Sequence, residues 1–205
     1  VGIGASINEA WDKAYDADPV SIFGGIVALN DVVDAELAEK LSKIFLEIII
    51  APGFTQEALD ILTQKKNIRL LELDTTLTPN NTLKYTNVND GLLVQDMDDH
   101  HTVKEDLECV TKRVPTEEEI EQLLFGWNIV KHVKSNAIVL VKDNQTVGVG
   151  AGQMNRVGAA RIAIEQAGEK AKGSVMASDA FFPMPDTVDE AIKAGDTAII
   201  QPAGL

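Results

Sequence analysis

The segment Val147-Gly148-Val149-Gly150-Ala151-Gly152 decides the fold, because a β-rich run there ends in alternating glycines and leads into a helical pattern at 155–171. The start of the chain repeats this arrangement, since Val1-Gly2-Ile3-Gly4-Ala5 leads into a helical pattern at 7–17. In both places a phenylalanine-bearing segment and then a Val-Asp pair follow in the same order. The repeat predicts two related structural units.

Helical and β-rich patterns alternate along most of the chain, which is typical of an α/β protein. The expected helices span 7–17, 34–45, 55–65, 116–133, 155–171 and 186–194. The expected strands span 25–29, 47–51, 68–73, 136–141, 146–149, 174–177 and 198–200. Because these strands are almost continuously apolar, we expect sheets that are covered on both faces.

The alternation is interrupted at 75–115, a polar stretch with possible short strands at 83–88, 91–95 and 108–112. We therefore expect a first unit at 1–74, a connecting excursion at 75–115 and a second unit at 116–205. The excursion contains Asp98-Asp99-His100-His101, which has the chemistry of metal ligands, but its polar surroundings favour a solvated loop. The glycine-rich start at Val1 and the apolar strand just before Leu205 predict that both units are incomplete and that the chain is part of a longer protein.

Composition excludes several classes of protein. The 205 residues include 45% hydrophobic residues and a single cysteine, so a disordered or disulfide-stapled chain is not expected. No apolar run reaches the roughly 18 to 20 residues of a membrane span. The net charge of -14 disfavours nucleic acid and anionic membranes as partners. Cytoplasm is the expected compartment.

The strongest candidate site combines the segment around Asn136 with the glycine-rich turn that ends at Arg156. Glycines allow a ligand to approach the backbone, and free N–H groups at a helix N-terminus together with Arg156 can meet a polar or anionic ligand. The alternative is a plain strand-to-helix turn with a solvated arginine. A dinucleotide site is weakly supported, because the glycine spacing differs from Gly-x-Gly-x-x-Gly.

Two further clusters follow expected strands. Ser178 to Asp186 contains two carboxylates and the pair Phe181-Phe182, although Asp186 could instead cap the next helix and the phenylalanines fill the core. Asp18 to Gly25 is a turn that ends in two glycines, and Glu47 opens an apolar strand, where a buried carboxylate would need a partner. Exposure at the edge of the strand is the alternative for Glu47.

Together these segments resemble the bifunctional phosphoribosylaminoimidazolecarboxamide formyltransferase / IMP cyclohydrolase family of purine biosynthesis. The resemblance covers nearly all of the chain and implies an α/β fold of two tandem cytidine-deaminase-like three-layer units. It implies the fold without the deaminase chemistry, because a zinc deaminase needs a Pro-Cys-x-x-Cys pair and this chain has one cysteine. We therefore expect no zinc.

The resemblance also implies residue roles. Binding of the substrate, aminoimidazole-carboxamide ribonucleotide, is expected at Gly24, Glu47, Asn136, Arg156 and Phe181, and contact with the co-substrate 10-formyltetrahydrofolate at Val157 and Asp186. At Met184-Pro185 the chain departs from the family pattern, which commonly has an aromatic and often a basic residue there, so the folate side is less well defined.

No catalytic residue is expected within residues 1–205. The family's Lys-His-x-Asn-Pro-Cys-Gly motif, which provides the proton acceptor, is absent, and Lys131-His132 lies on an expected helix without the residues that follow in that motif. The resemblance implies a homodimer with sites built across a two-fold interface. The alternatives are a non-catalytic ligand-binding or dimerisation module and, third, an NAD-dependent enzyme.

Overall fold

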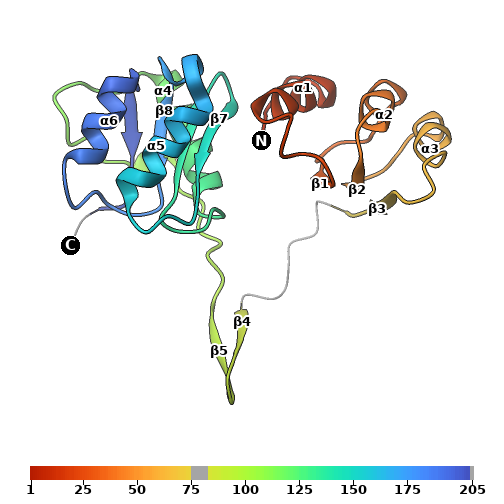
Figure 1. Ribbon diagram of the computed structural model, residues 1–205, viewed down its shortest axis with the longest axis horizontal. Helices are drawn as coiled ribbons and strands as arrows, with labels where there is room; N and C mark the ends of the chain where they lie inside the picture. Colours follow the sequence, from red (N-terminus) through yellow and green to blue (C-terminus); the bar gives the residue numbers. More distant parts are fainter. Residues whose placement is uncertain (75–82, 204–205) are drawn as a thin grey trace.

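The computed structural model describes residues 1–74 and 83–203. Within these ranges the chain forms a three-stranded parallel sheet, a two-stranded antiparallel hairpin and a four-stranded mixed sheet (Figure 1). The expected α/β class is confirmed. None of the described helices is both long enough and apolar enough to cross a membrane.

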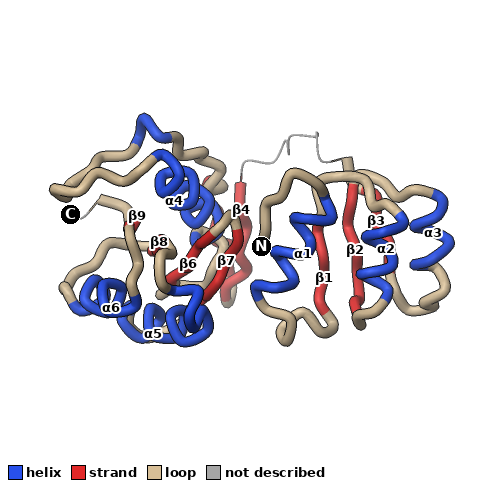
Figure 2. The backbone as a smooth tube through the Cα atoms, turned by 90° about the horizontal axis from the view of Figure 1, so that it is seen from above, coloured by secondary structure: helices blue, strands red, loops and turns tan. Residues whose placement is uncertain are grey.

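The first sheet has the strand order β1-β2-β3, with β1 at Gly25–Ala28, β2 at Leu46–Ala51 and β3 at Arg69–Glu72. Its helices are α1 (Ile7–Ala17), α2 (Ala35–Ser42) and α3 (Gln56–Leu62), and all three lie along the same face of the sheet (Figure 2). Each helix begins after a residue whose side chain accepts a hydrogen bond from the first turn; these caps are Ser6, Asp34 and Thr55. The helices bury Trp11, Leu37, Leu41, Ile49 and Leu62.

The opposite face of this sheet is open. Parallel pairing places Ile26 beside Ile48, and Ala28 beside Ile50, which in turn lies beside Leu71. Ile26 is 63% exposed and Leu71 is 47% exposed. The expectation that both faces are covered is therefore wrong for this sheet within the described residues, because helices pack on one face only.

The second sheet has the order β7-β6-β8-β9. Its strands are β6 (Ile138–Lys142), β7 (Gln145–Gly150), β8 (Val175–Ser178) and β9 (Ala198–Ile200). One face carries α5 (Arg156–Ala167), the 3-10 turn η2 (Gly168–Ala171) and α6 (Asp186–Ala194), and the other carries α4 (Glu117–Val130), as Figure 2 shows. Separate apolar clusters fill the two faces, so this sheet is covered on both.

Strand directions determine where a site can form on the second sheet. β6 is antiparallel to both β7 and β8, so β7 and β8 run in the same direction and end at the same edge. The segment that leads into β6 begins at that edge too. Polar residues at 135–136, after Gly150 and after Ser178 therefore meet there.

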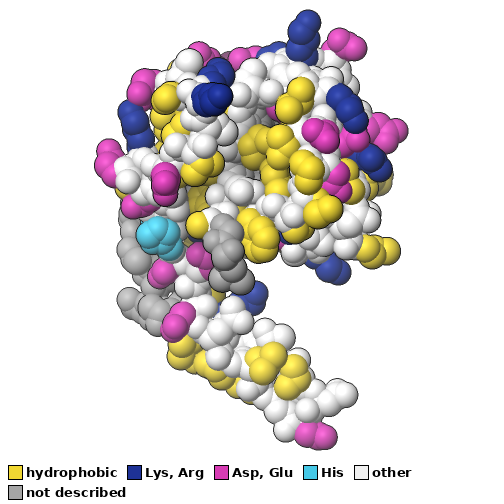
Figure 3. Space-filling view, turned by 90° about the vertical axis from the view of Figure 1, so that its left-hand side faces the viewer, with side chains coloured by type: hydrophobic (Ala, Val, Ile, Leu, Met, Phe, Trp, Pro, Cys, Tyr) yellow, Lys and Arg dark blue, Asp and Glu magenta, His cyan; other side chains and the backbone are white. Residues whose placement is uncertain are grey.

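Between the sheets, β4 (Leu83–Val88) and β5 (Gly91–Asp96) form a hairpin that projects from the molecule, and all of its residues are exposed. Figure 3 shows hydrophobic side chains along this projection. A short 3-10 turn, η1, follows at Lys104–Asp106. The expected strand at 108–112 is wrong, because these residues have no regular structure. Asp98 to His101 are exposed, and the described residues contain no group of three His, Cys, Asp or Glu that could hold a metal ion.

The N-terminal residues join the first sheet's helices to the edge strand β7. The Val1 ammonium donates to Thr146 Oγ1 at 2.8 Å, and the Ile3 amide donates to the Asn144 carbonyl at 2.9 Å. Further along α1, Asp16 accepts a hydrogen bond from Gln145 at 3.0 Å. These contacts place α1 beside β7.

Candidate functional site

The glycine-rich segment brings α5 close to β7. A Cβ atom on Gly148 would lie 2.0 Å from the Ala163 carbonyl oxygen, and one on Gly150 would lie 1.9 Å from the Ala159 carbonyl oxygen. The interpretation that these two glycines admit a ligand is therefore wrong, because their open side is occupied by the helix backbone. Gly152 has φ +65°, a left-handed conformation that turns the chain toward α5.

Arg156 and Asn136 meet at this edge of the sheet, as the sequence predicts. The Arg156 Nη2 group donates to Asn136 Oδ1 at 2.8 Å, and its Nη1 group donates to Ser178 Oγ at 3.1 Å. The Asn136 side-chain Nδ2 group donates in turn to the Gln153 carbonyl at 2.8 Å. Because the Arg156 side chain is only 11% exposed, the alternative of a solvated arginine is wrong.

Asp179 completes this cluster, and the sequence analysis did not single it out as a site residue. Its carboxylate accepts hydrogen bonds from the Arg156 guanidinium and, at 2.9 Å, from the Ala137 amide. Burial acts to raise the pKa of Asp179, but hydrogen bonds from Ser135, Ala137 and Arg156, with the guanidinium charge, hold it below its usual range. The signal for Asp179 was available, since it is the carboxylate that directly follows a buried strand at the edge where Arg156 begins its helix.

The remaining candidates near the second sheet lie on elements that leave the same edge. Phe181 follows β8 and is 37% exposed, whereas Phe182 packs against the core, so only the second phenylalanine fills it. Asp186 is the exposed first residue of α6, and its carboxylate accepts a hydrogen bond from the Thr187 amide at 2.8 Å. Val157 follows Arg156 in the first turn of α5 and is half-buried.

Gly24 and Glu47 lie at the start of neighbouring strands in the first sheet. Gly24 has φ +72°, which favours glycine, and its amide donates to the Phe45 carbonyl at 2.8 Å. Glu47 is exposed on β2, which agrees with the alternative of an exposed carboxylate at the edge of the strand. Within the described part of the chain, no hydrogen bond or ion pair joins Gly24 or Glu47 to the Arg156 cluster.

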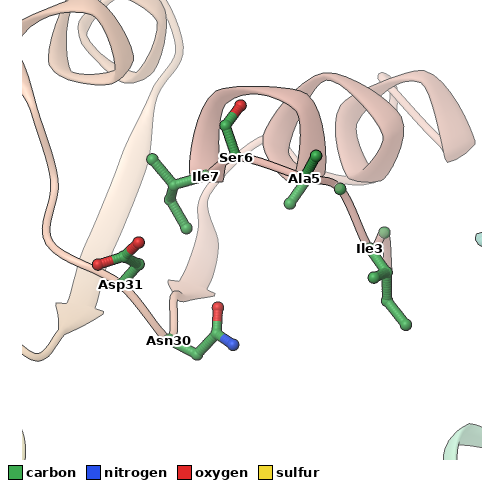
Figure 4. A pocket seen from close by; sticks show the side chains of 9 residues that line it. Ile3, Ala5, Ser6, Ile7, Asn30 and Asp31 are labelled. Atoms are coloured by element: carbon green, nitrogen blue, oxygen red, sulfur yellow. The ribbon is translucent and has the colours of Figure 1, made fainter.

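A separate pocket of about 240 Å³ lies at the N-terminus of α1 and contains none of the predicted site residues. Figure 4 shows Asn30 and Asp31, which follow β1, facing the segment that includes Ser6 and Ile7. Ser6 accepts a hydrogen bond from the Glu9 amide at 3.2 Å, and the Glu9 carboxylate accepts one from the Ala5 amide at 2.9 Å. These hydrogen bonds satisfy part of the helix start from within the chain.

The fold and the cluster define the class of protein. It is an α/β protein with an ion-paired arginine at the edge of the sheet where β7 and β8 both end. Comparison with known proteins gives the family. The family model described as AICARFT/IMPCHase bienzyme matches residues 1–166, so the chain belongs to that family. The resemblance seen in the sequence is confirmed.

Curated relatives agree with this family. The chain is 64% identical over 204 residues to the bifunctional purine biosynthesis protein PurH of Bacillus subtilis, and 63% identical to the proteins of the same name from Oceanobacillus iheyensis and Lysinibacillus sphaericus. Each match covers 100% of this chain and 40% of the relative. The chain therefore spans well under half the length of these bifunctional enzymes.

Proposed function

We propose that this chain forms part of the formyltransferase of IMP biosynthesis. The reaction transfers a formyl group from 10-formyltetrahydrofolate to the 5-amino group of aminoimidazole-carboxamide ribonucleotide, in a protein that also has IMP cyclohydrolase activity. The observation that carries the proposal is the Arg156–Asn136 contact at 2.8 Å, formed by two predicted nucleotide-binding residues in a chain that belongs to this family.

The proposed nucleotide contacts fall into two groups. Asn136, Arg156 and Phe181 belong to the second sheet and its loops, while Gly24 and Glu47 belong to the first. The proposed folate contacts, Val157 and Asp186, lie on α5 and α6, beside the first of these groups. Each group has accessible polar or aromatic surface, because Glu47, Phe181 and Asp186 are exposed.

A homodimer accounts for both groups. If one subunit supplies Asn136 and Arg156 and the other supplies Gly24 and Glu47, each site is complete across a two-fold interface, where every contact occurs twice. The open face of the first sheet, with Ile26 and Leu71 exposed, supports such an interface, because parallel sheets are normally covered on both faces.

The proposed chemistry needs groups beyond those in the cluster. The 5-amino group is conjugated with the ring and is a poor nucleophile, so transfer requires a general base and stabilisation of a developing oxyanion. Asn136 and Arg156 can bind and orient the nucleotide, but neither is a base. His132 carries a side chain that can act as a base, but it is exposed just after the end of α4 and is not part of the Arg156 cluster. We therefore propose that residues 1–205 bind ligand without catalysing formyl transfer.

The proposal includes the finer fold and setting. The sheets correspond to two tandem cytidine-deaminase-like units at 1–74 and 116–205, joined by the excursion at 75–115 and requiring no zinc. The protein acts in the cytoplasm on small molecules and does not bind nucleic acid or membranes. The strand-helix order supports the repeat, because α1 leads to β1 much as α5 leads to β8.

Separate titrations test the proposal. The protein, as its gene encodes it, is titrated with the nucleotide, a reduced folate and NAD, and then assayed for formyl transfer beside residues 1–205 alone. We expect binding of the nucleotide and the folate, and turnover only with the longer protein. Nucleotide binding with no turnover in either would favour the non-catalytic module, and NAD binding alone would favour the dinucleotide alternative.

A further inference from the structure

Asp179 connects three segments that carry the proposed nucleotide site. It follows β8, its carboxylate contacts Arg156 in the first turn of α5, and the same carboxylate accepts the Ala137 amide at 2.9 Å. The backbone amide of Asp179 donates to the Ala137 carbonyl at 3.3 Å, so Asp179 is hydrogen-bonded to both the amide and the carbonyl of the residue next to Asn136. Asp179 is not among the residues proposed to contact ligand, so the proposed function gives it no role.

The pair formed by Asp179 and Arg156 is largely withdrawn from water. Their side chains are 14% and 11% exposed, so either charge without the other would be poorly solvated. The guanidinium therefore presents directed N–H donors in a locally neutral cluster rather than an unbalanced positive charge.

The donors of Arg156 are divided between the protein and the site. A guanidinium has five N–H donors. Nη1 contacts Ser178 and Asp179, and Nη2 contacts Asn136. The Nε–H and the second Nη2 hydrogen have no partner among the described residues. The contacts with Ser178 and Asp179 fix the orientation of the group and leave these two donors without a protein partner in the described part of the chain.

We infer that Asp179 is a positioning residue for the nucleotide site, which holds Arg156, and through Arg156 the Asn136 side chain, in the arrangement that binds ligand. This inference rests on the proposed function. Asp179 acts through Arg156 and does not itself contact the nucleotide.

The test compares Asp179→Asn with Glu119→Gln in the protein as its gene encodes it. Glu119 is a matched control, because its side chain is 13% exposed and accepts hydrogen bonds from Arg113 at 2.7 and 2.9 Å, on the first turn of α4. Calorimetric titration with aminoimidazole-carboxamide ribonucleotide measures Kd, and thermal unfolding measures Tm. Both variants lower Tm, but only Asp179→Asn raises Kd, by about 10-fold to 100-fold, as expected when a charge-assisted contact no longer orients a binding group.

A double-mutant cycle separates positioning from general destabilisation. With Arg156→Lys already present, Asp179→Asn should change Kd by less than about 3-fold, because the group through which it acts is gone. The same fold-change in both backgrounds would overturn the inference. So would an unchanged Kd in Asp179→Asn while the unsubstituted protein binds the nucleotide. Failure of the unsubstituted protein to bind would instead overturn the proposed function, and the inference with it.

A milder variant covers the case in which Asp179→Asn does not fold. Ser135→Ala removes one hydrogen bond to the Asp179 carboxylate and keeps the ion pair. We expect Kd to rise by about 3-fold to 10-fold with little change in Tm. An unchanged Kd in this variant would also overturn the inference.

Discussion

The two sheets differ in how their apolar strands are covered. In the second sheet, α4 covers one face and α5 with α6 covers the other, and every residue of β8 is buried. In the first sheet, α1, α2 and α3 share one face, and Ile26 on the opposite face is 63% exposed. An apolar strand therefore indicates that both faces of its sheet should be covered, but it does not specify which element, or which molecule, covers them.

The sheets also differ in how their site residues are held. Arg156 and Asn136 are fixed by a hydrogen-bonded cluster, whereas Glu47 is exposed on the surface of β2. The second sheet therefore presents a preorganised half of the proposed site. The first presents a half whose geometry depends on what covers it.

The largest expected effect on stability concerns glycines that allow a helix backbone to pack closely against them. In Gly150→Ala the new Cβ would lie 1.9 Å from the Ala159 carbonyl oxygen, so β7 or α5 must move, and we expect a loss on the order of 4 kcal/mol in unfolding free energy. In Gly4→Ala the closest atom is the Ala10 nitrogen at 2.5 Å, and a loss of about 2 kcal/mol is expected. Denaturant unfolding measures both.

Gly53→Ala is the control for this pair, because its Cβ would find only a Val32 methyl group, at 3.8 Å. It should change stability by less than about 0.5 kcal/mol. If Gly150→Ala were as mild as Gly53→Ala, the close packing of α5 on β7 would be refuted.

The next effect separates the two halves of the site. Arg156→Ala leaves the Asp179 carboxylate without its charged partner, and we expect a loss of about 3 kcal/mol in stability. Glu47→Ala removes an exposed side chain and should cost less than about 0.5 kcal/mol. Both should weaken nucleotide binding under the proposed function. Equal losses of stability, measured by thermal unfolding, would contradict the difference between the halves.

Much of this could be predicted from the sequence where the signal is local. The helix starts at Asp34 and Thr55 follow from capping chemistry, and the strand-helix alternation gives the α/β class. The candidate site that combines Asn136 with Arg156 was also predicted, because Asn136 opens an expected strand and Arg156 follows the glycine-rich end of another.

What the sequence could not give depends on long-range pairing. Asp179 reaches Ala137 only because β8 pairs with β6 in the register that sets Ser178 beside Ile138. The packing role of Gly148 depends in the same way on where α5 crosses β7. The open face of the first sheet depends on cover that no pattern within its strands specifies.

A smaller effect concerns pH. Burial raises the pKa of Asp196, between α6 and β9, to about 6, although a hydrogen bond with Ser174 at 2.5 Å opposes the shift. The Ser174 hydroxyl also lies 2.8 Å from the Ala171 carbonyl and has one proton to give, so a protonated Asp196 completes the network. On α1 and at its C-terminal end, hydrogen bonds lower the pKa of Glu9, Asp16 and Asp18 instead.

The sign follows from proton linkage. Because the folded state binds more protons at Asp196 than the unfolded state between pH 3.8 and about 6, its contribution to stability falls as pH rises through that window. The contribution lost is about 2 kcal/mol. Asp196→Asn should remove this dependence, and urea unfolding at pH 4 and pH 7 measures it. An identical pH slope in both proteins would show that Asp196 is not held neutral by the fold.

The smallest expected effect tests the open face itself. Ile26→Ala should change the unfolding free energy of the dilute chain by less than about 0.5 kcal/mol, because a side chain that is 63% exposed gives up little burial. The matched control is Ile138→Ala in β6, where the side chain is 0% exposed and about 2 to 5 kcal/mol should be lost. Sedimentation over a concentration series then asks whether Ile26→Ala weakens self-association, as the proposed homodimer requires if this face lies in the interface. If Ile26→Ala were as costly as Ile138→Ala in the dilute chain, the first sheet would be covered within a single molecule and the contrast between the two sheets would disappear. A small cost together with weaker association would instead place the missing cover on a second copy of the chain.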